Sequence, residues 1–219
     1  MWRSARPALT PILAVDVDGV LLDPSRGGLG PWGNAVRDRL GIDRSALRDA
    51  FFLPYWDEIV TGHTAIEPPL SRALGELGTS ASVDEVLACW FEADFVVDEP
   101  VVAAVRAWAD QGVTVVLATN QEPRRLAFLR ERLGAVLPLT AVLGSAELGV
   151  VKGDDRFWSA AAAQLALPAD APRPVLLDDD LGNVTVARRC GWGGVHFAGE
   201  GSWVDDVERA LRERGRLRA

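Results

Sequence analysis

Hydrophobic and polar positions divide the chain into two regions with different patterns. From residue 98 onward, short apolar runs alternate with segments whose apolar residues recur every three or four positions, which is typical of buried strands alternating with helices. The pattern predicts strands at 113–118, 139–143, 174–177 and 194–197, helices at 100–111, 122–133, 154–167, 181–190 and 203–214, and a further strand in the apolar run bounded by Pro11 and Gly19. Such alternation favours right-handed crossovers and a parallel sheet covered on both faces.

Residues 34–93 show only the helical period, in segments near 34–40, 43–51, 55–61, 66–77 and 82–92. Ser82 followed by Glu85 fits a capping box at the start of the last of these segments. The sequence therefore predicts an α/β protein with a Rossmann-like parallel sheet core at 1–23 and 97–219. An inserted α-helical domain at 24–96 interrupts this core once.

The predicted insertion contains a cluster of aromatic residues, Phe51, Phe52, Tyr55 and Trp56. Aromatic residues at this spacing are expected between packed helices, and lining a substrate pocket is the alternative. His63 lies between Gly62 and Thr64 and is expected on a surface loop.

A glycine-rich stretch precedes these helices and imitates a nucleotide-binding motif. Gly28, Gly30 and Gly33 match the spacing G-x-G-x-x-G, but Pro31 interrupts the motif and no strand runs directly into it. A dinucleotide site is therefore not expected, and a hinge loop is.

Length and charge narrow the classes of function. A chain of 219 residues that is 48% hydrophobic can bury a sizeable core. Its formal charge of −8 and pI near 4.8 disfavour nucleic acid or an anionic membrane as a partner, because both require a basic face. The two cysteines, Cys89 and Cys190, form no disulfide framework or zinc motif, which fits a reducing cytoplasm. Residues 1–10 are expected to be a loosely held leader, and the oligomeric state stays open.

Two carboxylates follow the first predicted strand. Asp16 and Asp18 are two positions apart, so they lie on the same side of an extended chain and converge at its carboxyl end. Two like charges this close favour a cation between them, and oxygen ligands favour Mg²⁺. In the alternative interpretation the two aspartates only begin a turn, with Gly19 supplying a positive φ.

Other predicted strands also end in polar residues. Thr119 and Asn120 follow the strand at 113–118, and Asp178, Asp179 and Asp180 follow the strand at 174–177. The carboxyl ends of parallel strands share one edge of the sheet, so these residues are expected to meet Asp16.

Lys152 precedes the next helix and is the only lysine beside 22 arginines. A lone ammonium in a chain that otherwise uses guanidinium indicates a site that needs a compact point charge.

These residues suffice for phosphoryl transfer from a phosphate monoester. Asp16 would attack phosphorus to give an aspartyl phosphate, and Asp18 would protonate the leaving oxygen and then deprotonate the hydrolytic water. The hydroxyl of Thr119, the backbone N–H of Asn120 and the ammonium of Lys152 would hold the phosphoryl oxygens. Asp179, helped by Asp178, would complete a magnesium shell with Asp16 and the Asp18 carbonyl.

These pieces, in this order, resemble the four motifs of the haloacid dehalogenase (HAD) superfamily. Asp16-Val17-Asp18-Gly19-Val20 is similar to the first motif, Leu117-Ala118-Thr119-Asn120 to the second, Lys152 to the third, and 177–183 to the fourth. The resemblance covers essentially the whole chain. It implies that residues 24–96 form a cap over the active site, and it implies the same residue roles.

Two positions depart from the family pattern. The third motif commonly contains Lys-Pro, and here Lys152 precedes Gly153. The fourth motif contains three consecutive aspartates, so either Asp178 or Asp179 could be the direct metal ligand, and the usual alignment favours Asp179.

The sequence therefore predicts a Mg²⁺-dependent phosphatase, a hydrolase that acts on a small phosphorylated metabolite. Dehalogenases of the resembled superfamily lack an acid two residues after the nucleophile, whereas this chain has Asp18 there. Phosphonate-cleaving members use a cap lysine, and the predicted cap has none. A sugar phosphomutase stays the alternative enzyme, and a phosphoacceptor or non-catalytic regulatory protein is the alternative from another class. The substrate itself is not fixed by the sequence.

Overall fold

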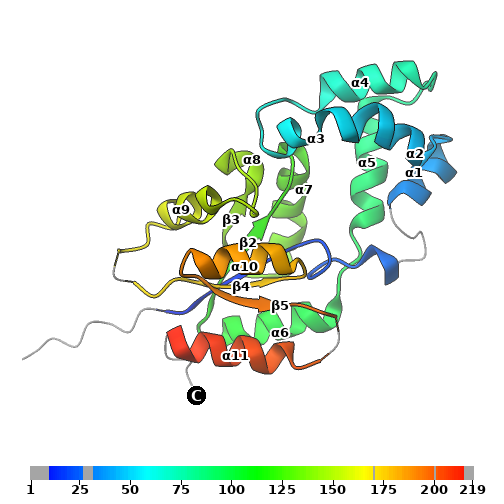
Figure 1. Ribbon diagram of the computed structural model, residues 1–219. Helices are drawn as coiled ribbons and strands as arrows, with labels where there is room; N and C mark the ends of the chain where they lie inside the picture. The colour runs from blue at the N-terminus through cyan, green and yellow to red at the C-terminus, as the bar shows by residue number, and fades with distance from the viewer. Residues whose placement is uncertain (1–9, 27–31, 170, 200, 215–219) are drawn as a thin grey trace, which may run out of the picture.

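A parallel sheet forms the centre of the molecule (Figure 1). The computed structural model describes residues 10–26, 32–169, 171–199 and 201–214. In this part of the chain the sheet has the order β3-β2-β1-β4-β5, and all neighbouring strands are parallel. The strands are β1 (Ile12–Val15), β2 (Thr114–Thr119), β3 (Leu139–Gly144), β4 (Val175–Asp178) and β5 (Gly193–His196). The predicted parallel α/β sheet is confirmed.

The first strand, β1, ends at Val15, before the Gly19 that bounds the predicted run. After Val15 the chain turns back on itself, and the N–H groups of Leu21 and Leu22 both donate to the carbonyl of Val17. Val17, Leu21 and Leu22 are fully buried all the same. These residues are thus buried outside β1, in the turn and in the isolated bridges that Leu22 forms with Asp18 and Val97, and sequence periodicity cannot separate this kind of burial from that of a strand.

The core helices are α6 (Glu99–Asp110), α7 (Pro123–Gly134), α8 (Ser145–Leu148), α9 (Asp155–Gln164), α10 (Leu181–Arg189) and α11 (Trp203–Arg214). Five of them were predicted. The sequence gives no signal for α8, because a single turn is too short to show a helical period.

Successive residues of β1 point to opposite faces of the sheet and belong to two different hydrophobic clusters. Leu13 and Val15 of β1 belong to the cluster that contains apolar side chains of α6, α7 and α11. Ala14, between them, belongs to a second cluster that contains side chains of α9 and α10. Helices therefore cover both faces of the sheet. Polar side chains of the strands can reach solvent or a ligand only at the edges of the sheet and at the strand ends.

The inserted helices pack into a unit of their own at one end of the molecule (Figure 1). They are the 3-10 turn η1 (Pro24–Arg26), α1 (Trp32–Leu40), α2 (Arg44–Leu47), the π-helical η2 (Arg48–Phe52), α3 (Leu53–Val60), α4 (Glu67–Glu76) and α5 (Val83–Asp94). The capping box of Ser82 and Glu85 is confirmed at the start of α5. A separate hydrophobic cluster holds these helices together. The inserted helical domain is thus confirmed, whereas the bounds 24–96 stay a prediction.

The aromatic residues of the insertion serve mainly as packing between helices. Phe51 is fully buried, and Phe52, Tyr55 and Trp56 pack half-buried against the same cluster. His63 is exposed in the turn after α3, as predicted.

The chain enters and leaves the inserted domain side by side. Leu22 and Val97 form an antiparallel bridge, the N–H of Asp23 donates to the carbonyl of Val96, and the N–H of Asp98 donates to that of Leu21. Two connections held together in this way fix the point where the helical domain joins the core.

Some of the sequence predictions fall outside the described residues. These are the leader over residues 1–9, Gly28 and Gly30 of the glycine-rich loop, and the end of the chain after residue 214. Gly33, by contrast, lies in the first turn of α1. Among the described helices, none combines the length and the apolar character that a membrane crossing requires.

Candidate active site

Asp16 follows the central strand β1 at the carboxyl edge of the sheet. Its N–H donates to the carbonyl of Leu177 at the end of β4, 2.9 Å away, and its carboxylate Oδ1 accepts from the N–H of Val17 at 2.8 Å. Strand order reverses between β1 and β4, because β2 and β3 lie on one side of β1 and β4 and β5 on the other. Open α/β sheets bind their ligands at such a switch point.

Lys152 lies directly against Asp16. Its Nζ is 2.7 Å from Oδ1 of Asp16 and 2.7 Å from Oδ2 of Asp178, and its side chain is only 2% exposed. Burial alone would lower the pKa of Lys152, but the two carboxylates outweigh it, and the pKa lies above the usual lysine value. The ammonium is therefore charged at neutral pH.

The loop that carries Lys152 is anchored through its backbone. The N–H of Lys152 donates to Oδ1 of Asn120 at 2.9 Å, and its carbonyl accepts from Nε1 of Trp158 at 2.9 Å. These bonds fix the peptide groups on either side of Cα without the proline that commonly follows this lysine in the resembled superfamily. The backbone of Lys152 is therefore held in place although glycine, and not proline, follows it.

The three consecutive aspartates after β4 occupy three different environments. Asp178 is fully buried and accepts from Lys152, from the amide of Asn183 and from the N–H of Asp180. Asp180 caps α10 by accepting from the N–H of Gly182. Asp179 is exposed like Asp180, but its carboxylate faces Asp16 and Asp178.

Carboxylate oxygens of Asp16, Asp178 and Asp179 all lie within 4.8 Å of one another. Burial raises the pKa of Asp16 to about 7, opposed by Lys152 and reinforced by Asp178. Burial also raises the pKa of Asp179, and the charge of Asp178 adds to that effect. Such mutual repulsion is what a bound cation relieves, and an all-oxygen donor set fits Mg²⁺.

Gly19 makes room for this cluster. It has φ of +79°, and a Cβ at this position would overlap the carboxylate of Asp179. A side chain at this position would therefore strain the left-handed backbone and would displace the carboxylate of Asp179.

The end of β2 supplies the predicted phosphate-binding residues. Thr119 is buried, and its Oγ1 lies 3.3 Å from Nε2 of Gln121. The side chain of Asn120 is used by the backbone of Lys152, which leaves its own N–H as the predicted donor to a phosphoryl group. Both residues therefore stand beside the strand that carries Asp16.

Asp18 lies apart from the acid cluster and has partners that were not predicted. Its Oδ1 accepts from Nη2 of Arg125 at 2.6 Å, and its Oδ2 accepts from Nε2 of Gln121 at 2.5 Å. The Asp18 side chain is 45% exposed, whereas that of Arg125 is 4% exposed. Its carboxylate is thus not grouped with the acid cluster, and a role of the Asp18 carbonyl at the metal stays a prediction.

The sequence analysis gave no role to Gln121, Arg125 or Asp94, and it included Asn183 only as the last residue of the stretch 177–183. Gln121 and Arg125 stand directly after the end of β2, in the turn before α7 and in its first turn. Polar residues in a turn that follows a strand end are a usable signal. Asp94 comes from the inserted domain, and no local pattern in the sequence relates it to Asp18.

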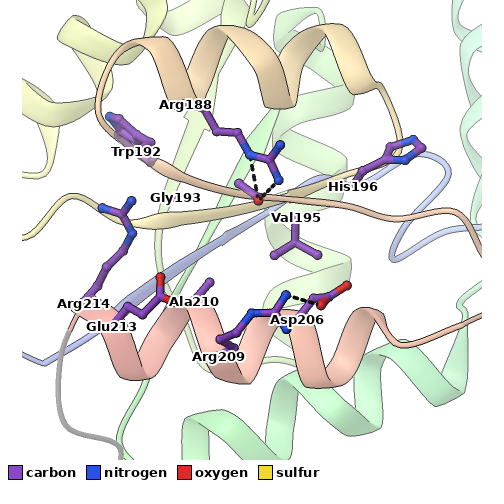
Figure 2. A pocket seen from close by; sticks show the side chains of 11 residues that line it. Arg188, Trp192, Gly193, Val195, His196, Asp206, Arg209, Ala210, Glu213 and Arg214 are labelled. Carbon is purple, nitrogen blue, oxygen red and sulfur yellow. Dashed lines mark hydrogen bonds and ion pairs between the residues drawn. The ribbon is translucent and has the colours of Figure 1, made fainter.

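Two hollows elsewhere on the molecule contain none of the predicted site residues. One, of about 400 Å³, lies between α10, β5 and α11 (Figure 2). Its arginines are already paired, since Arg188 donates to the carbonyl of Gly194 and Arg209 to the carboxylate of Asp206. The third, Arg214, donates to the carbonyl of Gly191 at 3.2 Å. The other, of about 700 Å³, lies in the inserted domain and is lined by Trp32, Phe52, Trp56 and residues of α2 and η2.

No protein-family model and no curated protein matches the chain. Solved structures do. The HAD family enzyme BT-2542 from Bacteroides thetaiotaomicron, in complex with magnesium and inorganic phosphate, is 16% identical, with a TM-score of 0.67 over 88% of this chain and 96% of its own. A predicted HAD-like family hydrolase from Porphyromonas gingivalis is 14% identical, with a TM-score of 0.68 over 93% of this chain and 98% of its own.

An L-2-haloacid dehalogenase from Xanthobacter autotrophicus is also similar, at 16% identity and a TM-score of 0.61 over 94% of this chain and 83% of its own. These three proteins align with the chain over 83–98% of their own length, at identities that establish the fold alone. The chain therefore has the fold of the haloacid dehalogenase superfamily.

Proposed function

We propose that this protein is a magnesium-dependent phosphatase that hydrolyses a small phosphate monoester through an aspartyl-phosphate intermediate. One observation carries the proposal: Lys152 is buried between Asp16 and Asp178, at the point where these two carboxylates meet that of Asp179. A charged ammonium beside clustered carboxylates is the environment in which one anion can attack another.

The residues at this edge of the sheet fit Mg²⁺. Asp16 and Asp179 would hold the ion with the carbonyl of Asp18, and Asp178 would support them by fixing Lys152. Asp179 is proposed as the direct ligand because each oxygen of Asp178 already accepts a hydrogen bond inside the protein. When bound, the ion supplies charge neutralisation to the phosphate and to Asp16.

The chain's own residues perform the proposed steps. A carboxylate oxygen of Asp16 attacks phosphorus, while Lys152, the hydroxyl of Thr119 and the N–H of Asn120 stabilise the phosphoryl oxygens. Asp18 gives a proton to the leaving oxygen and later takes one from the water that hydrolyses the intermediate. BT-2542, which has the same fold, was solved with magnesium and inorganic phosphate, and this supports the proposal.

The inserted helices are proposed to act as a cap over this site, with the bounds 24–96. Two connections support this proposal. Oγ of Ser145, on α8, donates to the carbonyl of Val60 at 2.6 Å, and Arg124 of α7 pairs with Asp84 of α5 at 2.8 Å. Substrate selectivity would then depend on side chains that the inserted domain presents to the core.

Other kinds of protein with this fold would use the same residues differently. Dehalogenation releases halide, which needs no proton, so a dehalogenase would have no use for Asp18 as an acid. A sugar phosphomutase would use the same residues but would return the phosphoryl group to a sugar. A regulatory protein would bind phosphate without turnover. A panel of phosphorylated metabolites and halocarboxylic acids, each assayed with magnesium and with EDTA, separates these cases by the release of phosphate, isomer, halide or nothing.

Magnesium should stabilise the folded protein more at about pH 8 than at about pH 5.5. The raised pKa of Asp16, about 7, means that the folded chain keeps a proton between about pH 4 and 7 that the unfolded chain has lost. Without metal, stability should therefore fall as pH rises through this window. A cation competes with that proton and binds best once it has left. Thermal unfolding with magnesium and with EDTA at both pH values measures the difference.

The variant Asp179→Asn tests whether this stabilisation by magnesium depends on Asp179. It keeps the shape of the side chain and removes one carboxylate of the cluster, so the stabilisation by magnesium should shrink. An equal magnesium effect in the variant and in the unchanged protein would contradict the assignment of Asp179.

Asp18→Asn should separate the two halves of the reaction. An aryl phosphate with a good leaving group needs no acid, so the phosphoenzyme still forms, but the water step loses its base. We expect one rapid release of aryl alcohol per active site, followed by turnover that is about 10²- to 10⁴-fold slower than in the unchanged protein. Stopped-flow absorbance measures both phases, and slow release without a burst would contradict the role of Asp18.

A further inference from the structure

Asp18 is joined to the inserted domain through one buried arginine. Nη2 of Arg125 donates to Oδ1 of Asp18 at 2.6 Å, and its Nη1 donates to Oδ2 of Asp94 at 3.1 Å. Asp94 is the last residue of α5 in the inserted domain, and it is 6% exposed. A single guanidinium thus connects a residue of the proposed reaction to a helix of the other domain.

The two hydrogen bonds to Asp18 fix its orientation and leave it able to accept a proton. Arg125 uses one acceptor site on Oδ1, and Gln121 uses one on Oδ2. Each carboxylate oxygen offers two such sites, so one on each oxygen stays free of these donors. A carboxylate held in this way can receive a proton from water without first having to rotate.

Arg125 is in turn fixed by the inserted domain. Its guanidinium lies over the ring of Trp90, 5.6 Å from the centroid, and bonds to Asp94. Asp94 is itself held by Nε1 of Trp90 at 2.9 Å and by the N–H of Trp32 at 3.0 Å. The position of the guanidinium therefore depends on α1 and α5.

We propose that Arg125 is a positioning residue for Asp18 in the hydrolysis of the phosphoenzyme, and that Asp94 holds Arg125 in place. The proposal rests on the proposed function. In the step concerned, the oxygen of a water molecule bonds to phosphorus and the bond from phosphorus to the Asp16 oxygen breaks. Asp16 leaves as a carboxylate, and the proton of the water passes to a free acceptor site of Asp18. Arg125 forms and breaks no bond; it fixes where that site points.

The competing interpretation is that Arg125 only ties the two domains together. Its neighbour Arg124 does so without touching Asp18, since it pairs with Glu67 at 3.4 Å and with Asp84 at 2.8 Å. Arg124→Met therefore removes contacts between the domains and leaves the Asp18 carboxylate in place. It is the matched control for Arg125→Met.

The experiment measures turnover and the steady-state fraction of phosphoenzyme by acid quench, using 4-nitrophenyl phosphate with magnesium. A misplaced base should slow the water step by about 10²-fold and leave the first step nearly intact, so Arg125→Met should accumulate phosphoenzyme. Arg125→Lys should recover part of the rate, because it restores a cation of shorter reach. Asp94→Asn should shift both quantities in the same direction by a smaller amount, and Arg124→Met should shift neither.

A second comparison separates positioning from general damage. In a chain that already carries Asp18→Asn, adding Arg125→Met should cost almost nothing further, because the base is already absent. Thermal unfolding identifies variants that fail to fold. If Arg125→Met is one of them, the turnover and phosphoenzyme level of Arg125→Lys and Asp94→Asn decide the question instead.

Two results would overturn the proposal. One is a loss of turnover in Arg125→Met without accumulation of phosphoenzyme, and the other is an Arg124→Met variant that behaves in the same way. If the unchanged protein neither turns over nor becomes phosphorylated, the proposed function fails and this proposal fails with it. Normal turnover by the unchanged protein with no specific effect of Arg125 rejects the positioning role alone.

Discussion

Asp16→Asn is expected to lower kcat for an aryl phosphate by at least about 10⁴-fold, because the side chain that attacks phosphorus loses its nucleophilic oxygen. The replacement keeps the size of the side chain and can still accept a hydrogen bond from Lys152 and from the N–H of Val17. Loss of activity should therefore come without loss of the fold. A steady-state assay with magnesium measures the effect.

The stability of the same variant gives an independent check. Burial and the charge of Asp178 raise the pKa of Asp16 to about 7, so at about pH 8 a charged Asp16 destabilises the metal-free protein. Asp16→Asn removes that charge and should leave the thermal unfolding temperature in EDTA unchanged or higher. An inactive variant that also unfolds at a much lower temperature would show damage to the fold instead of loss of a nucleophile.

Lys152→Met is expected to lower the free energy of unfolding by about 3–5 kcal/mol, the cost of removing one partner from a buried ion pair. The side chains of Asp16 and Asp178 are 10% and 0% exposed, so two carboxylates would stay buried without the ammonium that both contact. Urea unfolding in EDTA measures the loss. Magnesium should restore part of it by neutralising the same carboxylates.

Arg156→Met is the matched control for Lys152→Met. Arg156 lies four residues away and pairs with Asp154 at 2.7 Å, but its side chain is 80% exposed. Removing an exposed pair should leave the unfolding curve almost unchanged, because solvent already screens the charges. A Lys152→Met protein as stable as this control would contradict the burial of a charged lysine between two carboxylates.

The alternation of strands and helices was predictable because each element follows a local period. The proximity of the strand ends at Asp16, Thr119 and Asp178 was also predictable from sequence, because parallel strands share a carboxyl edge. The lone lysine was informative for a different reason. The chain has 22 arginines and a single lysine, and this lysine lies in the loop between α8 and α9, buried against two carboxylates.

What could not be predicted depends on contacts between distant segments. Asp178 and Asp179 are identical in sequence terms, and only the positions of Lys152 and Asn183 assign them to buried and exposed environments. No feature of the sequence distinguishes Arg125 from the other arginines, because its proposed role depends on its hydrogen bond with Asp94, which lies 31 residues earlier in the inserted domain. The first strand was also predicted to run further than β1 does, because the apolar residues of the turn that follows it are as buried as those of a strand.

The most direct test of the central claim is to find where a phosphoryl group is attached to the protein. Asp18→Asn, mixed with an aryl phosphate and magnesium, is quenched in acid, digested and mapped by mass spectrometry. The account predicts one phosphorylated peptide, modified at Asp16, and none in the double variant Asp16→Asn/Asp18→Asn or when EDTA replaces magnesium. A phosphoryl group on any other residue, or turnover of the unchanged protein with no phosphorylated peptide in the variant, would contradict it.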